Sequence, residues 1–432
     1  MSAAVRVGYK QTEVGVIPAD WEVFPISTLT TEFRGGAPLK PADFTDRGVK
    51  VLPKGGVGRT GVLHIAEKDL QYCCPEYADA HPRNQVNRDY TIVVLRDLVP
   101  SGPSIGLMVE IGTEESFVLA QGVYGFKVNS ARADARYLIQ LSNTSWYRNL
   151  ANSIMVGSTQ VHITNTAFKR AVLPVPAITE QRTISTALSD VDALLSKLDA
   201  LIAKKRDLKQ AAMQQLLTGQ TRLPGFSGEW EVKRLGDIGD CLRGVTYKGD
   251  SDIWPHDTAQ TKRLLRSNNV QNAVVVFEDM QFVNSERVSS HQLLRPNDIL
   301  ICMANGSKAL VGKAGLFSLR DGYDYTFGAF MGCFRSNNAT SNSSFVFYLF
   351  QTGRYRDYIN NLLAGSSINN LSPGSIESLE FQVPTLAEQT AIATVLSDMD
   401  AELTALEARR DKSRSLKQGM MQELLTGRIR LV

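Results

Sequence analysis

Two long stretches of the chain carry apolar residues at alternating spacings of four and three, the first within residues 176–219 and the second within 384–427. This heptad spacing predicts a helix with an apolar seam that packs against a partner helix. Neither stretch has an interior proline, and about 38 helical residues extend about 57 Å at 1.5 Å per residue. The predicted seam residues are Ile184, Leu188, Val191, Leu195, Leu198 and Ile202 in the first stretch, and Ile392, Leu396, Met399, Leu403 and Leu406 in the second.

The two stretches are copies of each other. Glu180-Gln181 recurs as Glu388-Gln389, and "LLTG" ends both copies at Gly219 and Gly427. The likeness extends to "DWEV" (20–23) and "EWEV" (229–232), so the chain is a duplication of units of about 200 residues. Because a whole body separates the copies, we expect them to pair antiparallel in one chain. Two unrelated helices, each packed on its own domain, remain the alternative.

The remaining sequence forms two variable bodies. Each contains short β-rich runs split by turn signals and ends in an aromatic-bearing segment that predicts one helix, at 135–154 and 343–363. The fold expected is α+β: two similar domains joined by two long antiparallel coiled-coil helices, with pseudo-two-fold internal symmetry. The expected boundaries are 1–172 and 222–380 for the bodies and 173–221 and 381–432 for the helices. The expected strands lie at 49–52, 90–95, 116–128, 273–277, 298–303 and 332–336.

Composition narrows the function classes only a little. The net charge is +3, and 43% of residues are hydrophobic, which is ordinary for a globular protein. No apolar run reaches the roughly 18 residues of a membrane span, and the N-terminus has no signal-peptide core. The five cysteines have no metal-ligand spacing and the five histidines are scattered, so we expect a cytoplasmic protein without a metal site.

The segment "LPKGGVGRTG" (52–61) resembles a phosphate-binding loop, with Arg59 in place of the second lysine. A nucleotide hydrolase acting through Lys54–Thr60, or a self-contained methyltransferase, is therefore one alternative. Against it, no helix is expected after Thr60, and the chain has no NPP[FY] or DPPY signature. The counterpart in the second body is "LRSNNVQNAV", with Leu52 over Leu265 and Lys54 over Ser267. A loop that keeps its place but changes its polar residues is typical of a recognition loop.

Several motifs together resemble the specificity subunits of type I restriction–modification systems. They are "YKQTEVGVIPADWEV" (9–23), its echo "LPGFSGEWEVKRLGDIG" (223–239), and the "EQ…I…LSD" start and "LKQ…LLTG" end of both long stretches. The resemblance covers essentially the whole chain.

The resemblance implies a non-catalytic DNA-binding subunit for phage defence. Each body would read one half of a split, asymmetric double-stranded DNA target. The helices would hold two methyltransferase subunits, which methylate adenine with S-adenosylmethionine, and a restriction subunit that uses ATP and Mg²⁺ can join. The chain itself would bind no cofactor. A coiled-coil scaffold that binds only proteins remains a third hypothesis.

DNA readers are expected on four pairs of loops, since polar and basic side chains reach base edges and phosphates. For each residue, a solvated loop side chain is the alternative. The candidates in the first body are Arg34, Lys54, Arg59, Ser104, Ser158, Thr159 and Gln160. Those in the second are Arg243, Tyr247, Lys248, Arg266, Asn268, Asn269, Asn305, Ser307, Lys308, Ser366, Ser367, Asn369 and Asn370. The basic runs 204–209 and 409–417 fit either phosphate or partner contact, or a solvated helix flank.

Overall fold

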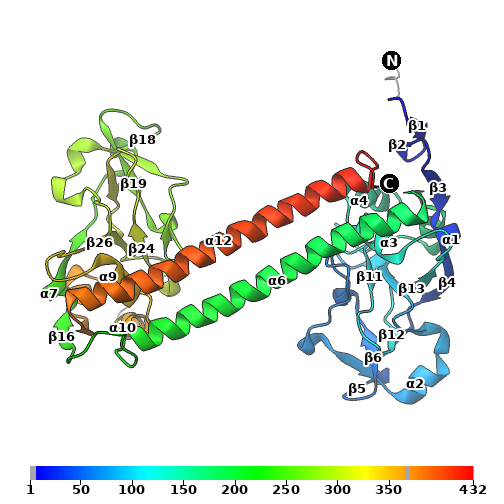
Figure 1. Ribbon diagram of the computed structural model, residues 1–432, viewed down its shortest axis with the longest axis horizontal. Helices are drawn as coiled ribbons and strands as arrows, with labels where there is room; N and C mark the ends of the chain where they lie inside the picture. Colours follow the sequence, from blue (N-terminus) through cyan, green and yellow to red (C-terminus); the bar gives the residue numbers. More distant parts are fainter. Residues whose placement is uncertain (1–5, 365–368, 432) are drawn as a thin grey trace. The chain divides into compact units, whose positions relative to one another are not determined.

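A computed structural model describes residues 6–364 and 369–431 and divides the chain into two compact units (Figure 1). Unit 1 comprises Met1–Asp199 and Ala408–Val432, and unit 2 comprises Ala200–Glu407. The division falls within both long helices, so each unit holds one body and a half of each helix. Among the described helices, none combines the length and apolar character needed to cross a membrane.

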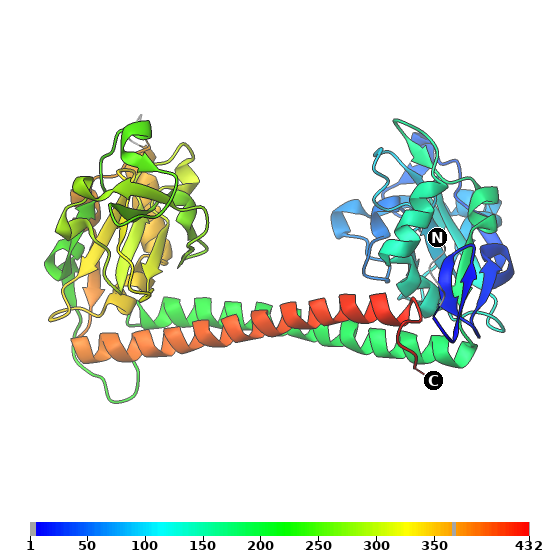
Figure 2. The ribbon, with the colours of Figure 1, turned by 90° about the horizontal axis from the view of Figure 1, so that it is seen from above.

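The two heptad stretches are helices, as predicted: α6 spans Ile178–Leu216 and α12 spans Leu386–Leu424. They run antiparallel and side by side within each unit (Figure 2). In unit 1 Lys417 pairs with Asp192 at 2.7 Å. The equivalent pair in unit 2 joins Lys209 and Asp400 at 2.5 Å. The same pair of residue types thus links the helices in both units.

The predicted seam serves two partners. Ile184 and Leu188 are buried in the core of the first body together with Leu424 of α12, and Ile392 and Leu396 are buried in the second. The helix ends therefore pack on their own bodies as well as on each other, which combines the two arrangements that the sequence left open. Of the other seam residues, Leu198, Ile202 and Leu403 are buried, whereas Val191, Leu195, Met399 and Leu406 are half-buried.

The basic runs on the helices form ion pairs with the opposite helix. In unit 2 Lys205 bonds Glu402 at 2.7 Å and Arg206 bonds Glu407. In unit 1 Arg410 lies 3.8 Å from Asp199. These contacts support the solvated-flank interpretation of the two runs.

The first body contains two larger sheets, three two-stranded sheets (β1-β2, β10-β14 and β15-β3) and short helices. One sheet has the strand order β11-β9-β13-β4 and the other β5-β7-β6-β12-β8. The strands are β1 (Tyr9–Thr12), β2 (Gly15–Pro18), β3 (Glu22–Pro25), β4 (Thr30–Gly35), β5 (Phe44–Thr45), β6 (Val49–Leu52), β7 (Gln71–Cys73), β8 (Gln85–Val86), β9 (Thr91–Val94), β10 (Arg96–Asp97), β11 (Met108–Glu110), β12 (Phe117–Leu119), β13 (Val123–Val128), β14 (Val161–His162) and β15 (Val172–Val175). The helices are α1 (Ile26–Leu29), α2 (Pro75–Ala80), α3 (Ala135–Ser142), α4 (Ser145–Ser153) and α5 (Asn165–Arg170).

The second body repeats this plan, with sheets β17-β26-β23-β24-β21-β20 and β18-β22-β19-β25. β23 takes the place of β9 within the sheet, and every residue of both strands is buried. The strands are β16 (Glu231–Arg234), β17 (Gly239–Arg243), β18 (Ile253–Trp254), β19 (Thr261–Leu265), β20 (Val270–Gln271), β21 (Val274–Val275), β22 (Gln281–Asn284), β23 (Asp298–Cys302), β24 (Ala314–Phe317), β25 (Tyr325–Phe327), β26 (Met331–Ser336) and β27 (Glu380–Val383). The helices are α7 (Leu235–Ile238), α8 (Gly249–Asp252), α9 (Ser343–Leu349), α10 (Gly353–Ala364) and α11 (Pro373–Glu377).

Three details of the predicted elements were wrong. The strand expected at 116–128 is two strands, β12 and β13, separated by residues 120–122. The aromatic segment of each body is two helices instead of one, α3 and α4 in the first and α9 and α10 in the second. The break comes where a threonine caps the second helix, since Thr144 accepts a hydrogen bond from the amide of Tyr147 and Thr352 from that of Tyr355. The strand expected at 273–277 is reduced to Val274–Val275.

A buried carboxylate stands at the start of each long helix. Glu180 is 3% exposed, and both of its oxygens accept hydrogen bonds from Arg430, at 2.6 and 2.8 Å. In unit 2 the equivalent Glu388 accepts two from Arg222, at 2.5 and 2.6 Å. This pairing raises the pKa of both guanidinium groups. Each arginine follows the end of one helix, so each pair joins that end to the start of the other helix.

Arg430 in unit 1 offers a direct test of this junction. Arg430→Met leaves Glu180 buried without its charged partner, and we expect it to lower the free energy of unfolding by about 3 kcal/mol. The matched control is Arg428→Met in the same tail, whose pair with Glu423 is exposed and should contribute less than about 1 kcal/mol. Urea denaturation followed by circular dichroism measures both. Equal losses for the two variants would show that the buried pair has no special role.

Candidate nucleic-acid interface

The loops expected to read DNA in unit 2 converge on one turn. This turn joins β25 to β26 and comprises residues 328–330; we call it the central turn. Its Gly328 amide donates to Leu265, at the start of the 266–273 loop, at 3.0 Å. The Phe330 carbonyl accepts from Met303, which begins the 303–313 loop, at 2.9 Å.

Of the other two loops of unit 2, one is attached beside the central turn and one to the neighbouring 303–313 loop. The Val245 amide, in the loop after Arg243, donates to Phe327 beside the central turn at 2.8 Å. The Leu371 amide, in the loop before α11, donates to Met303 at 2.8 Å. Four backbone hydrogen bonds therefore bring together segments that lie far apart in the sequence.

Unit 1 contains the same four bonds around its own central turn, residues 120–122. The amides of Ala120, Ala37, Leu95 and Ile163 donate to the carbonyls of Leu52, Leu119, Gly122 and Leu95, respectively, at 2.8 to 3.1 Å. Backbone groups form all of them, so the attachment places few demands on the side chains. The sequence pointed to neither turn: residues 120–122 fall inside the strand expected at 116–128, and 328–330 carry no candidate reader. The position of both turns depends on the pairing of distant strands.

Three of the candidate readers instead hold their own loops together. Asn269 is fully buried; its amide group donates to Val276 and Glu278 and its oxygen accepts from the Arg266 amide. It is removed from the candidate readers because neither end of its amide is free.

Arg34 and Ser104 are corrected for a similar reason. Arg34 donates to the carbonyls of Pro82 and Gln85 and pairs with Glu32, whose pKa falls to about 2 through its bonds with Tyr90, Lys127 and Arg34. Ser104 donates to Asp97 at 2.6 Å. The sequence offers no signal that separates such residues from exposed readers.

The other described candidates are exposed or half-buried, and some of them also bond within their unit: Arg266, Asn268, Asn305, Lys308 and Asn369. Ser366 and Ser367 lie outside the described residues. Arg59, Ser158, Thr159, Gln160, Arg243, Lys248, Ser307, Lys308 and Asn370 are exposed, and Lys54, Tyr247, Arg266, Asn268, Asn305 and Asn369 are half-buried. Both units thus place polar and basic side chains on the loops around the central turn.

The segment that resembles a phosphate loop has a different structure. Lys54–Gly56 forms one turn of 3-10 helix after β6, and Ser267–Asn269 forms the equivalent turn after β19, which confirms the alignment of the two loops. A Cβ atom on Gly56 would lie 2.9 Å from a terminal methyl of Leu63, so this glycine is closely packed against the Leu63 side chain. No α-helix begins directly after this turn. The loop therefore lacks the helix N-terminus that binds the phosphates of a nucleotide in a phosphate-binding loop.

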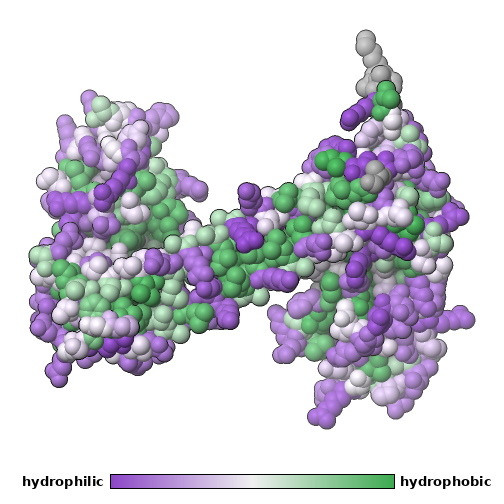
Figure 3. Space-filling model, in the orientation of Figure 1, coloured by the Kyte–Doolittle hydropathy of each residue, from purple (hydrophilic) through white to green (hydrophobic). Residues whose placement is uncertain are grey.

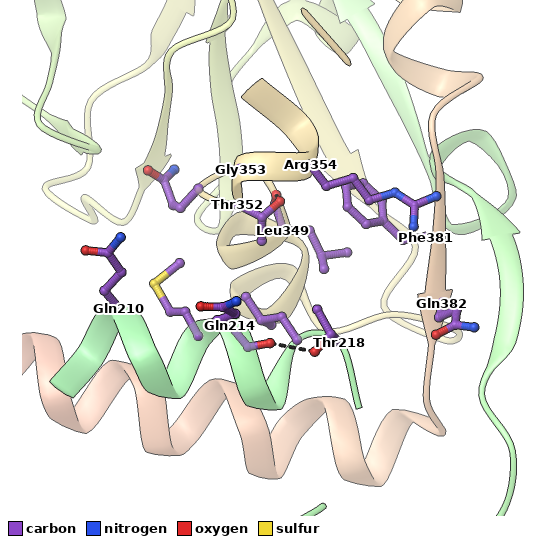
Figure 4. Close-up of a pocket in the computed structure, with 12 residues that line it drawn as sticks. Gln210, Gln214, Thr218, Leu349, Thr352, Gly353, Arg354, Phe381 and Gln382 are labelled. Atoms are coloured by element: carbon purple, nitrogen blue, oxygen red, sulfur yellow. Dashed lines mark hydrogen bonds between the residues drawn. The ribbon is translucent and has the colours of Figure 1, made fainter. Parts of the chain in front are cut away.

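The two units differ beside the equivalent helix ends. Unit 2 has a groove of about 470 Å³ next to the C-terminal part of α6, with Gln214, Arg354 and Phe381 among its lining residues (Figure 4). In unit 1 the equivalent pocket, of about 640 Å³, is lined partly by the hairpin β1–β2. Tyr9 of this hairpin donates to the Gly427 carbonyl at 2.9 Å, and Trp146 donates to the Val14 carbonyl at 3.1 Å. The surfaces at the two helix ends are therefore unequal.

Comparison with known proteins identifies the family to which this duplicated fold belongs. The family model for the type I restriction modification DNA specificity domain matches residues 18–205 and 227–413. The chain therefore belongs to this family and carries two copies of its domain.

Several individual proteins are similar. The specificity subunit of the type I restriction enzyme EcoKI from Escherichia coli K12 is 32% identical over 200 residues, which is 46% of this chain and 42% of that protein. The chain thus spans less than half the length of this relative. The putative MjaX specificity subunit of Methanocaldococcus jannaschii is 22% identical over 98% of this chain and 97% of its own.

Two solved structures share the fold. The type I S subunit from M. genitalium has a TM-score of 0.58 at 14% identity, covering 94% of this chain and 96% of its own. A chain from work on complex assembly and conformational transition of the type I R-M system has a TM-score of 0.54 at 14% identity, covering 96% and 99%.

The adjacent Asn268 and Asn269 provide a test of the corrected assignment. Asn269→Ala leaves buried carbonyls without donors and should cost about 1–3 kcal/mol of stability. Asn268→Ala removes a half-buried side chain with one 3.3 Å bond to Asp279 and should change stability by less than about 0.5 kcal/mol. Thermal unfolding measures both. Comparable losses, or a greater loss for Asn268→Ala, would contradict the assignment.

Proposed function

We propose that this chain is the DNA-recognition subunit of a type I restriction–modification complex and that each unit reads one half of an asymmetric bipartite target. One observation carries the proposal: the same four backbone bonds gather four loops in both units, while the loop side chains differ. Two units with the same loop backbone arrangement and different loop side chains are suited to bind two different half-sites.

The readers act through accessible side chains around each central turn. Asparagine and glutamine can bond adenine, and arginine and lysine can bond guanine or phosphate. In unit 1 the exposed tip 158–160 supplies Ser158, Thr159 and Gln160, and Arg59 supplies a cation. In unit 2 the exposed candidates include Arg243 at the end of β17, Lys308, and Asn370 in the loop that corresponds to 157–164. Base contacts set the sequence preference, and phosphate contacts hold the register.

Partner subunits supply the chemistry. Two methyltransferase subunits dock on the repeated helices and bring S-adenosylmethionine, and restriction subunits bring ATP and Mg²⁺. Two equivalent leucines support this docking: Leu208 of α6 is 47% exposed and Leu416 of α12 is 60% exposed. Apolar side chains recur among hydrophilic ones on the visible face of the long helices (Figure 3). A leucine left in water at the same place in both copies fits an identical partner on each.

Coexpression with the neighbouring methyltransferase, followed by genome-wide mapping of N6-methyladenine, tests the function. One split motif with unequal halves is expected. Sequence-independent or absent methylation, despite a stable complex with the methyltransferase, would favour the scaffold that binds only proteins. ATP hydrolysis by the pure chain would favour the enzyme alternative.

Single variants should affect the two half-sites separately. Asn370→Ala in unit 2 should relax the bases accepted in one half of the motif, and Gln160→Ala in unit 1 should relax the other. A lost base contact lowers discrimination at that position by about 1–3 kcal/mol. Methylation sequencing of randomised targets measures the change. Relaxation of the same half by both variants would contradict one half-site per unit.

The docking surface has its own test. Leu208→Glu and Leu416→Glu should each weaken binding of the methyltransferase about tenfold, as expected for loss of an apolar interface anchor. Leu201→Arg is the matched control, because α12 already carries arginine, Arg409, at the equivalent position. Affinity is measured by titration of the purified subunits. Unchanged affinity in both leucine variants would place the docking surface elsewhere.

A further inference from the structure

Phe330 is an exposed aromatic residue at the centre of the unit 2 loops. Its side chain is 71% exposed, although a phenylalanine ring gains free energy by leaving water. The backbone beneath it is fixed: the Phe330 carbonyl accepts from the amides of Met303 and Ala304 at 2.9 and 3.1 Å. The Met331 amide also donates to Gly328 at 2.7 Å and closes the turn. The ring is therefore held in solvent by an ordered turn.

The neighbouring loops are polar. Ala304 pairs with Asn370, and the Gly328 and Met331 backbones bond the loops that carry Arg266 and Arg243. All three of these side chains are candidate DNA readers. If those polar side chains contact DNA, the exposed ring faces the same DNA surface. The ring then gains free energy only where that surface presents an apolar group.

Unit 1 has no equivalent side chain. The counterpart of Phe330 is Gly122, whose carbonyl accepts the same hydrogen bond, from Leu95 at 3.0 Å. Gly122 has a φ of +88°, and a Cβ atom there would lie 2.8 Å from Arg96. The framework therefore forms without an aromatic residue at this position. Phe330 is a feature of one recognition surface, not of the fold.

We propose that the Phe330 ring contacts the 5-methyl group of a thymine in the half-site read by unit 2. This inference rests on the proposed function. The thymine methyl is the apolar group that base edges present in the major groove, and aromatic side chains can contact it. Insertion of the ring between base pairs is the other use of an exposed phenylalanine. The central turn is bonded to loops on several sides, which favours contact with base edges over insertion.

The test combines one protein change with one DNA change. The complex with methyltransferase is prepared with the wild-type chain, Phe330→Leu or Phe330→Ala. Each thymine of the bipartite target is then replaced in turn by deoxyuridine, which lacks only the methyl group. Wild type should bind one substituted duplex, changed in the unit 2 half-site, about 3- to 5-fold more weakly, the effect of one methyl group leaving apolar contact.

The variants decide whether that effect belongs to Phe330. Phe330→Ala should bind thymine and deoxyuridine duplexes equally, and Phe330→Leu should retain part of the difference. Gln121→Ala, in the central turn of unit 1, should keep the wild-type preference. Substitutions in the other half-site should affect wild type and Phe330→Ala alike.

Several outcomes would overturn the proposal. They are a unit 2 half-site without thymine, no response of wild type to any substitution, or a preference that persists in Phe330→Ala. Insertion of the ring between base pairs would give a different result. Phe330→Ala would then bind all duplexes more weakly by the same factor, and only the wild-type chain would unstack a 2-aminopurine base placed in the target. If wild type has no bipartite preference at all, the proposed function fails first, and that result is distinct from the loss of this one contact.

Discussion

The buried carboxylate at the start of each long helix is the interaction on which the arrangement of each unit depends. Glu180 and Glu388 require a cation because an unpaired charge in these positions is costly. The arginine comes from the chain just beyond the other helix, so the start of one helix is held to the end of its antiparallel partner. Trp21, which directly precedes β3, donates to Glu180 at 3.2 Å and so ties the body to the same junction. One ion pair thereby sets helix register and attaches the body.

The recognition surface is built on a second constraint, which uses only the backbone. In both units three of the four loop segments bond the central turn or the residue before it, and the fourth bonds one of those segments. These bonds do not depend on loop side chains. This is why Gly122 and Phe330 can occupy equivalent positions, and why "PKGG" and "RSNN" can follow equivalent strands. Recognition residues can therefore change while the framework persists, which is the property that a subunit with two different half-sites requires.

The existence and length of the long helices could be predicted, about 38 residues against 39 in each, because heptad periodicity and the internal repeat are local signals. The alignment of Lys54 with Ser267 was also confirmed. Side-chain roles in the site could not be predicted in the same way. Asn268 and Asn269 are identical neighbours, yet only Asn269 is fully enclosed, by carbonyls of a later segment. Phe330 gained its significance only from four long-range bonds. The domain boundaries and the DNA contacts remain predictions.

Hydrogen–deuterium exchange of the chain in complex with methyltransferase, with and without its target duplex, tests the central claim most directly. If each unit reads one half-site, the target duplex should slow amide exchange in the loops around both central turns. These loops include 157–164 in unit 1 and 303–313 in unit 2. A duplex with one half-site replaced should lose protection in one unit and retain it in the other. Protection confined to α6 and α12, or the same in both units for every duplex, would contradict the account.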